Sequence, residues 1–129
     1  MREIQKVLIV DDDANIRTIA EMSLEGLTDW QLRLADSAEQ AMSLINAEKS
    51  DLILLDMTMP DTDGVTFFGN LRTTFGGDCP AVILLSAKVQ AHEVARYQSL
   101  GAVGVITKPF DPMTLPAEIM QLLECSATN

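Results

Sequence analysis

Four short apolar runs divide the chain, and each ends at a polar residue. The runs occupy residues 7–10, 52–55, 82–85 and 103–106. Runs of this length that end in turn residues are typical of strands buried on both faces of a parallel sheet. A fifth segment, 31–35, alternates polar and apolar residues, and Gly101 and Gly104 weaken the run at 103–106. We therefore expect these last two segments to be the edge strands.

Apolar residues between the strands recur at helical spacing. They fall within 16–27, 38–45, 67–75, 91–95 and 115–123. Ser37 and Gln40 form a capping box before the second segment. Pro116 predicts an irregular start of the last helix near Thr114, because proline is tolerated only in the first turn. The alternation predicts an α/β fold: a flavodoxin-like, doubly wound, five-stranded parallel sheet in the order 2-1-3-4-5, with five helices.

The length of 129 residues is enough for one hydrophobic core. We expect one domain over residues 1–124 and a short tail at 125–129 that frays. No apolar run approaches the roughly 20 residues that span a bilayer, and the N-terminus leads into the first strand without a signal peptide. We therefore expect a cytoplasmic protein without membrane contact. Cys79 and Cys125 lack the spacing of a metal or redox motif.

The formal net charge is −10, and the nine Lys and Arg residues are scattered along the chain. Proteins that bind a phosphate backbone cluster these residues on one surface. Direct nucleic-acid binding is therefore not expected, and the partners should be proteins and cations. Trp30, Tyr97, His92 and the seven methionines are interpreted as packing or surface residues without a function of their own.

Polar side chains stand where four of the predicted strands end. They are Asp11, Asp12 and Asp13, then Asp56, Ser86 and Lys108. A sheet of this order binds ligands beyond the carboxyl ends of its strands, at the switch point between strands one and three. Carboxylates brought together there repel one another unless a cation binds, and oxygen ligands without His or Cys favour Mg²⁺. Asp56, Lys108 and Ser86 could then serve phosphoryl transfer as nucleophile, charge-neutralising ammonium and hydrogen-bond donor.

Each of these residues also has a simpler interpretation. Asp13 could be only the N-cap of the following helix. Lys108 could be a solvated surface lysine, and Ser86 a turn or cap residue. Their joint occurrence at four strand ends, in an order compatible with one crevice, favours a ligand site.

Four motifs resemble those of the receiver domains of response regulators, and the resemblance extends over essentially the whole chain. They are VLIVDDD at 7–13, DLILLDMTMPDTDG at 51–64, VILLSA at 82–87 and ITKPF at 106–110. The resemblance, which includes single-domain chemotaxis regulators, implies that Asp56 accepts a phosphoryl group from a histidine kinase or phosphotransfer protein. Phosphorylation would switch binding to a downstream protein, with the domain monomeric or forming a dimer when phosphorylated. Such a domain promotes its own phosphorylation and dephosphorylation and is not otherwise an enzyme.

The resemblance also implies a metal site and two residues that modulate it. Asp11, Asp12 and Asp56 would hold Mg²⁺, together with the backbone carbonyl of Thr58. Thr58 and Lys88 would tune the lifetime of the phosphorylated form, because both flank the path of attacking water. Lys88 is expected to shield the phosphoryl group, although it could also point into solvent, since pinning a long side chain costs entropy.

Ser86 and Lys108 would contact the phosphoryl group, and the bond between Lys108 and Pro109 would be cis. Two positions depart from the family pattern, Pro116 in the last helix and one position in the last strand. Many receivers carry a rotating aromatic residue in the last strand where this chain has Val105. The usual coupling between Ser86 and that ring is therefore in doubt, and movement of residues 87–92 is an alternative route for the switch.

Two competing functions are compatible with parts of the pattern. In a haloacid-dehalogenase-like phosphatase, Asp11 would be the nucleophile and Asp13 the general acid. That alternative lacks the later paired acids and a cap domain, and it leaves Asp56 without a role. An inactive receiver-like interaction module is a third alternative, which the complete acidic set disfavours.

Overall fold

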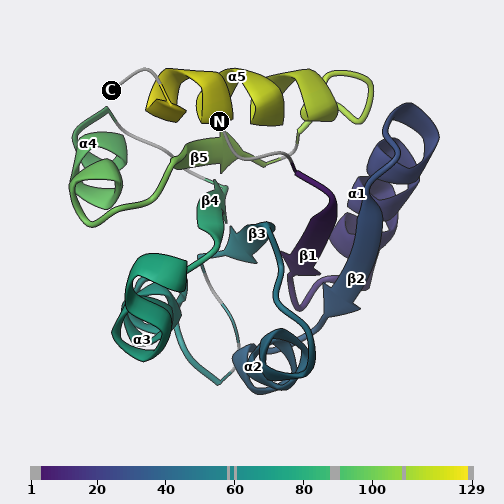
Figure 1. The fold of residues 1–129 in the computed structure, drawn as a ribbon. Helices are drawn as coiled ribbons and strands as arrows, with labels where there is room; N and C mark the ends of the chain where they lie inside the picture. Colours follow the sequence, from purple (N-terminus) through teal and green to yellow (C-terminus); the bar gives the residue numbers. More distant parts are fainter. Residues whose placement is uncertain (1–3, 58, 60, 88–90, 109, 128–129) are drawn as a thin grey trace.

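The computed structural model describes residues 4–57, 59, 61–87, 91–108 and 110–127 (Figure 1). The strands are β1 (Lys6–Val10), β2 (Gln31–Ala35), β3 (Leu52–Asp56), β4 (Ala81–Ser86) and β5 (Gly104–Thr107). The helices are α1 (Ala14–Leu27), α2 (Ala38–Ala47), α3 (Gly64–Phe75), the short 3-10 helix η1 (Gly76–Asp78), α4 (Ala91–Ser99) and α5 (Leu115–Ala127). All strand pairs are parallel and the order is β2-β1-β3-β4-β5. The predicted fold class and strand order are confirmed.

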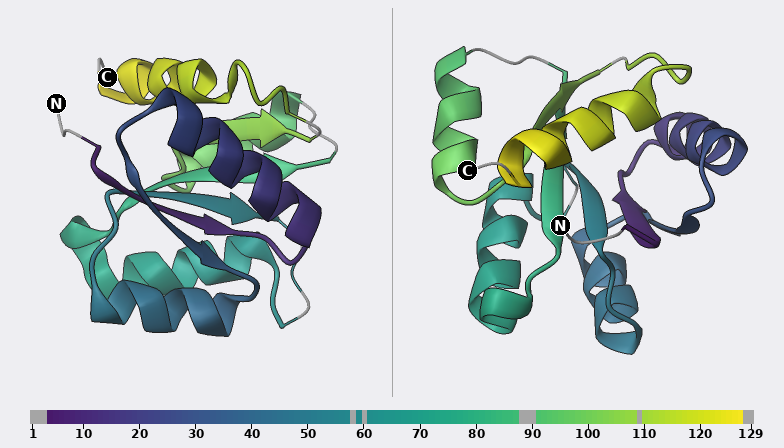
Figure 2. Two further views of the ribbon diagram at one scale, coloured as in Figure 1. Left: turned by 90° about the vertical axis from the view of Figure 1, so that its right-hand side faces the viewer. Right: turned by 45° about the horizontal axis from the view of Figure 1, so that its top comes forward.

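The sheet is the middle of three layers (Figure 2). Helices α1 and α5 cover one face, and α2, α3 and α4 cover the other. Side chains alternate between the faces along each strand. In β1, Val7 and Ile9 therefore pack against the α1 and α5 face, whereas Leu8 and Val10 pack on the other. Strand β3 is buried along its whole length because it lies at the centre of the sheet.

Side chains cap the helices that begin near the carboxyl ends of the strands. The Asp13 carboxylate accepts a hydrogen bond of 2.8 Å from the Asn15 backbone N–H, so Asp13 is the N-cap of α1. The Ser37 hydroxyl accepts one of 3.2 Å from the Gln40 N–H at the start of α2. The Gln40 side chain accepts a bond of 2.7 Å from the Asp36 N–H. The Ser37 and Gln40 pair thus forms a capping box that reaches one residue further back than usual.

The last helix starts irregularly, as Pro116 predicts. The backbone N–H groups of Thr114 and Leu115 both donate to the Asp111 carbonyl, at 3.1 and 3.0 Å, before α5 begins. Pro116 is the second helical residue, where its missing N–H has no intrahelical partner to lose. The helix continues to Ala127, so positions 125–127, which the pattern assigned to a tail, are helical. No glycine or proline interrupts the segment after Pro116.

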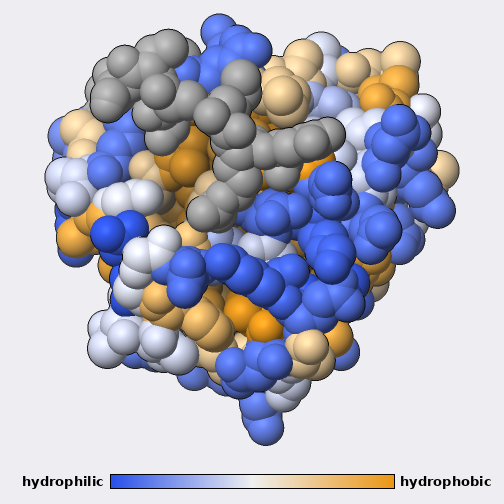
Figure 3. All heavy atoms as spheres, viewed as in Figure 1, coloured by the Kyte–Doolittle hydropathy of each residue, from blue (hydrophilic) through white to orange (hydrophobic). Residues whose placement is uncertain are grey.

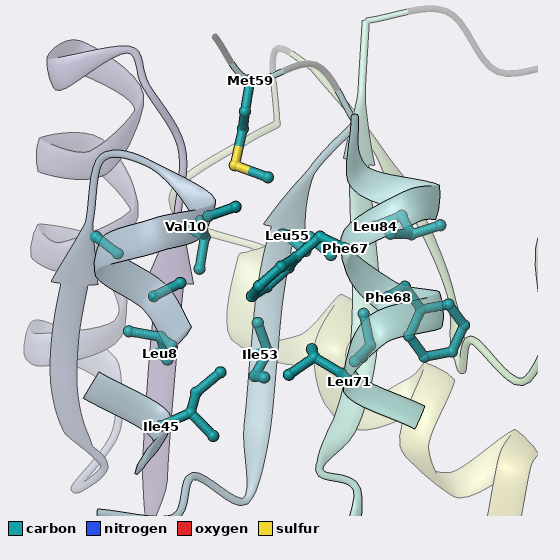
Figure 4. Close-up of a cluster of buried hydrophobic side chains, with 14 of the residues drawn as sticks. Leu8, Val10, Ile45, Ile53, Leu55, Met59, Phe67, Phe68, Leu71 and Leu84 are labelled. Atoms are coloured by element: carbon teal, nitrogen blue, oxygen red, sulfur yellow. The ribbon is translucent and has the colours of Figure 1, made fainter. Parts of the chain in front are cut away.

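The core between the sheet and helices α2 and α3 extends to the loop that follows β3 (Figure 4). Met59, in that loop, is buried, and its side chain points toward Val10 and Leu55. Phe67 of α3 packs in the same core. Since Met59 stands three residues after Asp56, its burial fixes the loop beside the end of the central strand.

The edge of the sheet where the strands begin lies opposite to the end that carries Asp56, and it faces the viewer in Figure 3. Hydrophilic and hydrophobic side chains are interspersed there. Arg33 of β2 lies toward this edge and donates to the Leu44 and Glu48 carbonyls at the end of α2, at 2.7 and 2.6 Å, and to the Ser50 hydroxyl. Within the described part of the chain, no helix has the length and hydropathy of a membrane span.

Candidate functional site

Three carboxylates meet where β1 and β3 end. One oxygen each of Asp11, Asp12 and Asp56 lies within 4.8 Å of the others. The parallel pairing of Val10 with Leu55 brings the residues that follow them to the same edge of the sheet. Asp11 is fully buried and Asp56 is 5% exposed, whereas Asp12 is open to solvent. The structure therefore brings together the acidic residues that the strand ends predicted.

Lys108 supplies a positive charge to this cluster. Its Nζ lies 2.6 Å from Asp11 Oδ2 and 3.0 Å from Asp56 Oδ1. The end of β5 positions it, because the Lys108 backbone N–H donates to the Ser86 carbonyl at 2.7 Å. Burial by itself lowers the pKa of Lys108, but Asp11 and Asp56 outweigh that effect and raise it above the ordinary lysine value. The side chain is therefore a fixed ammonium between two carboxylates.

The other polar atoms of Asp11 are also held in place. Its backbone N–H donates to the Ala35 carbonyl at 3.1 Å, and its Oδ1 accepts from the Asp13 N–H at 2.9 Å. Its backbone carbonyl accepts from Arg17 Nη1 at 2.7 Å. Sequence reasoning gave Arg17 no role. The signal that could have indicated such a role is a single cationic residue placed shortly after the acidic run at 11–13.

The donor set fits a hard divalent cation. Three carboxylates face the single ammonium of Lys108, so the cluster carries excess negative charge. Asp11 Oδ2 is buried and, over the described residues, meets Lys108 as an ion pair without accepting a well-aligned hydrogen bond. Oxygen donors of this kind suit Mg²⁺, which keeps several waters and takes few protein ligands. The cluster of Asp11, Asp12 and Asp56 could therefore hold Mg²⁺.

The first residue of α3 packs directly on the backbone of the central strand. The Gly64 N–H donates to the Met57 carbonyl at 2.8 Å. A Cβ at Gly64 would lie 2.6 Å from the Asp56 carbonyl oxygen and 2.9 Å from Met57 Cα. A residue without a side chain is therefore needed here. The hydrophobic pattern along the chain does not reveal this requirement, because it carries no information on close approach between distant segments.

Asp61 ties the loop after β3 to the start of α2. Its carboxylate accepts from the Ala38 and Glu39 backbone N–H groups at 3.3 and 3.1 Å. Partial desolvation raises the pKa of Asp61, but backbone N–H groups, those of Ala38 and Glu39 first and then those of Asp61 and Thr62, outweigh it, so the pKa lies below the ordinary aspartate value. The negative carboxylate at a helix N-terminus also suits the helix dipole. Together with buried Met59, this contact holds the loop at both ends.

The remaining predicted residues fall into two groups. Ser86, half-buried at the end of β4, pairs in register with Thr107 of β5. Val105 is half-buried and packs against the cluster that contains Tyr97 of α4, so that side of β5 faces α4. Three other residues for which roles were predicted, Thr58, Lys88 and Pro109, lie outside the described part of the chain.

Comparison with known proteins identifies the family. The family model described as the response regulator receiver domain matches residues 7–120. The chain is 36% identical over 118 residues to the phosphate regulon transcriptional regulatory protein PhoB of Pseudomonas aeruginosa, which covers 91% of this chain and 51% of that protein. It is 34% identical over 114 residues to a probable chemotaxis protein CheY of Rhizobium etli, covering 88% of each. The chain belongs to the response regulator receiver domain family.

The fold comparison agrees with that assignment. The structure matches the chemotaxis response regulator CheY4 of Vibrio cholerae with a TM-score of 0.83 at 24% identity, covering 93% of this chain and 99% of that chain. The chain spans about half the length of PhoB and of other curated relatives that it matches. It is thus a receiver domain of two-component response regulators, a phosphorylatable signalling domain whose standard role is to accept a phosphoryl group. The dehalogenase-like alternative is not supported.

Proposed function

We propose that this receiver domain is a Mg²⁺-dependent phosphoacceptor whose Asp56 takes a phosphoryl group from a histidine kinase or phosphotransfer protein. The observation that carries the proposal is the position of Asp56. It ends the central strand beside two further carboxylates, with Lys108 Nζ 3.0 Å from its Oδ1. Phosphorylation would then change binding to a downstream protein target. The domain would comprise residues 1–124 together with the last turn of α5, which ends at Ala127.

The step forms a bond between a carboxylate oxygen of Asp56 and phosphorus, and it breaks the phosphorus–nitrogen bond to the donor histidine. The ammonium of Lys108, already beside Asp56, would neutralise the phosphoryl oxygens, and the Ser86 hydroxyl would donate a hydrogen bond to them. Asp11 and Asp12, together with Asp56, would hold Mg²⁺. When bound, the ion neutralises charge on the carboxylates and on the phosphoryl group.

Further parts of the proposal rest on family membership and on charge. Thr58 would add a carbonyl to the metal site, and Thr58 and Lys88 would set the lifetime of the phosphorylated form. The peptide bond before Pro109 would be cis. The domain would promote its own phosphorylation and dephosphorylation in the cytoplasm, without direct contact with nucleic acid or membrane. It would act as a monomer or as a dimer that forms on phosphorylation, with Ser86 and the region around Val105 taking part in the switch.

Incubation with acetyl phosphate and Mg²⁺, followed by intact-mass spectrometry, tests the proposal. The wild-type chain should gain one phosphate, and both chelation of Mg²⁺ and Asp56→Asn should prevent the gain. Asp51→Asn is the matched control, because Asp51 stands at the other end of β3 and binds the Gln5 and Lys6 N–H groups at 3.0 and 2.9 Å. This control should be phosphorylated normally. An adduct that persists in Asp56→Asn would refute the assignment, and no adduct in the wild type would favour an inactive interaction module.

A further inference from the structure

Arg17 reaches from α1 into the acidic site and binds there in an unexpected way. It lies in the first turn of the helix, where its backbone N–H donates to the Asp13 carbonyl at 3.1 Å. Arg17 is half-buried, and its guanidinium donates from Nη1 to the Asp11 carbonyl at 2.7 Å. Over the described residues, Arg17 forms no ion pair with a carboxylate. A cation near three carboxylates thus binds a neutral backbone oxygen.

This choice of partner has a clear consequence for the carboxylates. A guanidinium usually pairs with a carboxylate through two parallel hydrogen bonds. By binding the Asp11 carbonyl instead, Arg17 leaves both Asp11 carboxylate oxygens to other partners. Oδ1 is held by the Asp13 N–H, and Oδ2 faces the ammonium of Lys108 at 2.6 Å. Arg17 thus fixes the Asp11 backbone without occupying the Asp11 carboxylate, which stays directed into the acidic cluster.

The contacts of Asp11 and Arg17 close a ring of hydrogen bonds. Arg17 is joined to Asp13 through its backbone and to Asp11 through its side chain, and Asp13 is joined to the Asp11 carboxylate. The turn between β1 and α1 is therefore held from both ends. Groups that orient a metal ligand from outside the coordination sphere commonly alter metal affinity by 10- to 100-fold when they are removed.

We infer that Arg17 is a positioning residue that holds Asp11 ready to bind a divalent cation, an inference that rests on the proposed function. Positioning and simple electrostatics predict opposite changes in Mg²⁺ affinity when Arg17 is removed. Arg17 is positive, so if its charge alone mattered, its removal would tighten Mg²⁺ binding. If Arg17 positions Asp11, its removal weakens Mg²⁺ binding, by about tenfold, although a repelling charge has been lost.

The test is an NMR titration of the metal-free chain with MgCl₂ for the wild type and three variants. Arg17→Met should weaken the affinity about tenfold. Arg17→Lys should restore part of it, because lysine keeps one donor. Arg33→Met is the matched control, since Arg33 also donates through Nη1 to a backbone carbonyl, that of Leu44, at the same 2.7 Å, but toward the opposite edge of the sheet. It should lower stability without changing Mg²⁺ affinity.

A second measurement needs no metal. Hydrogen exchange of the Asp13 amide, which is bonded to the Asp11 carboxylate, should be faster in Arg17→Met than in Arg33→Met. Unchanged or tighter Mg²⁺ binding in Arg17→Met, or equal weakening in Arg33→Met, would overturn the inference. If Arg17→Met does not fold, Arg17→Lys decides by the same criteria. Failure of the wild type to bind Mg²⁺ would instead refute the proposed metal site itself.

Discussion

Replacement of Gly64 by alanine should damage the site from the backbone side. The new methyl group would lie 2.6 Å from the Asp56 carbonyl oxygen and 2.9 Å from Met57 Cα. Ordinary contact begins near 3.4 Å, so helix α3 and the strand end must separate by about 0.8 Å. Neither neighbour is a flexible side chain. Overpacking of this kind costs about 1–3 kcal/mol, from which alanine recovers about 0.4–1 kcal/mol by restricting the unfolded chain.

The displacement should affect chemistry more than stability. Misplacement of a reacting group by about 1 Å can lower a rate by 10²-fold, so Gly64→Ala should be phosphorylated by acetyl phosphate far more slowly than the wild type. Gly69→Ala is the control on the same helix, because a Cβ there meets nothing within 4 Å. It should be stabilised and react normally. Urea unfolding followed by the fluorescence of Trp30, the single tryptophan, measures stability. Equal stability and equal rates in both variants would refute the reasoning.

Three further predictions concern charge. Mg²⁺ at 100 times its dissociation constant should raise the free energy of unfolding by about 2.7 kcal/mol, and Asp11→Asn should remove most of that gain in calorimetric melts. The pKa of Lys108 is raised, so its contribution to stability is full below pH 10.5, the ordinary lysine value. That contribution is lost as the pH rises through the higher folded-state pKa. The difference in stability between the wild type and Lys108→Met should therefore shrink only in that high pH range. The pKa of Asp61 is lowered, so Asp61→Asn should be less stable than the wild type at neutral pH, with the difference disappearing as pH falls below 3.8, through the lower folded-state pKa.

The sequence predicted the strands, their order and the convergence of the acidic residues, because buried parallel strands and helical spacing are local patterns. It placed the strand boundaries less well. Asp56 and Ser86 belong to β3 and β4 in the structure, whereas the apolar runs stop one residue earlier. The hydrogen-bonded ladder depends on the backbone and continues past the last apolar side chain: Asp56 pairs with Leu85, and the Met57 N–H donates to the Leu85 carbonyl at 3.0 Å.

The contacts that hold the site could not be read from the sequence. Asp61 reaches back 23 residues to the Ala38 N–H, and Arg17 reaches back six residues to the Asp11 carbonyl. A polar side chain at a given position is compatible with solvent, a cap or a buried partner, and only the folded geometry decides among them. Asp13 illustrates this, because its predicted alternative role as an N-cap is the one that the structure shows.

Chemical mapping of the phosphorylated residue tests the central claim most directly. Borohydride reduces an aspartyl phosphate to homoserine, so reduction after treatment with acetyl phosphate and Mg²⁺ marks the acceptor permanently. Tandem mass spectrometry of the peptides then distinguishes Asp56 from Asp11, the nucleophile of the competing phosphatase-like chemistry. Phosphorylation of Asp56 predicts homoserine at position 56 and unmodified aspartate at position 11. Homoserine at position 11, with position 56 unmodified, would contradict it.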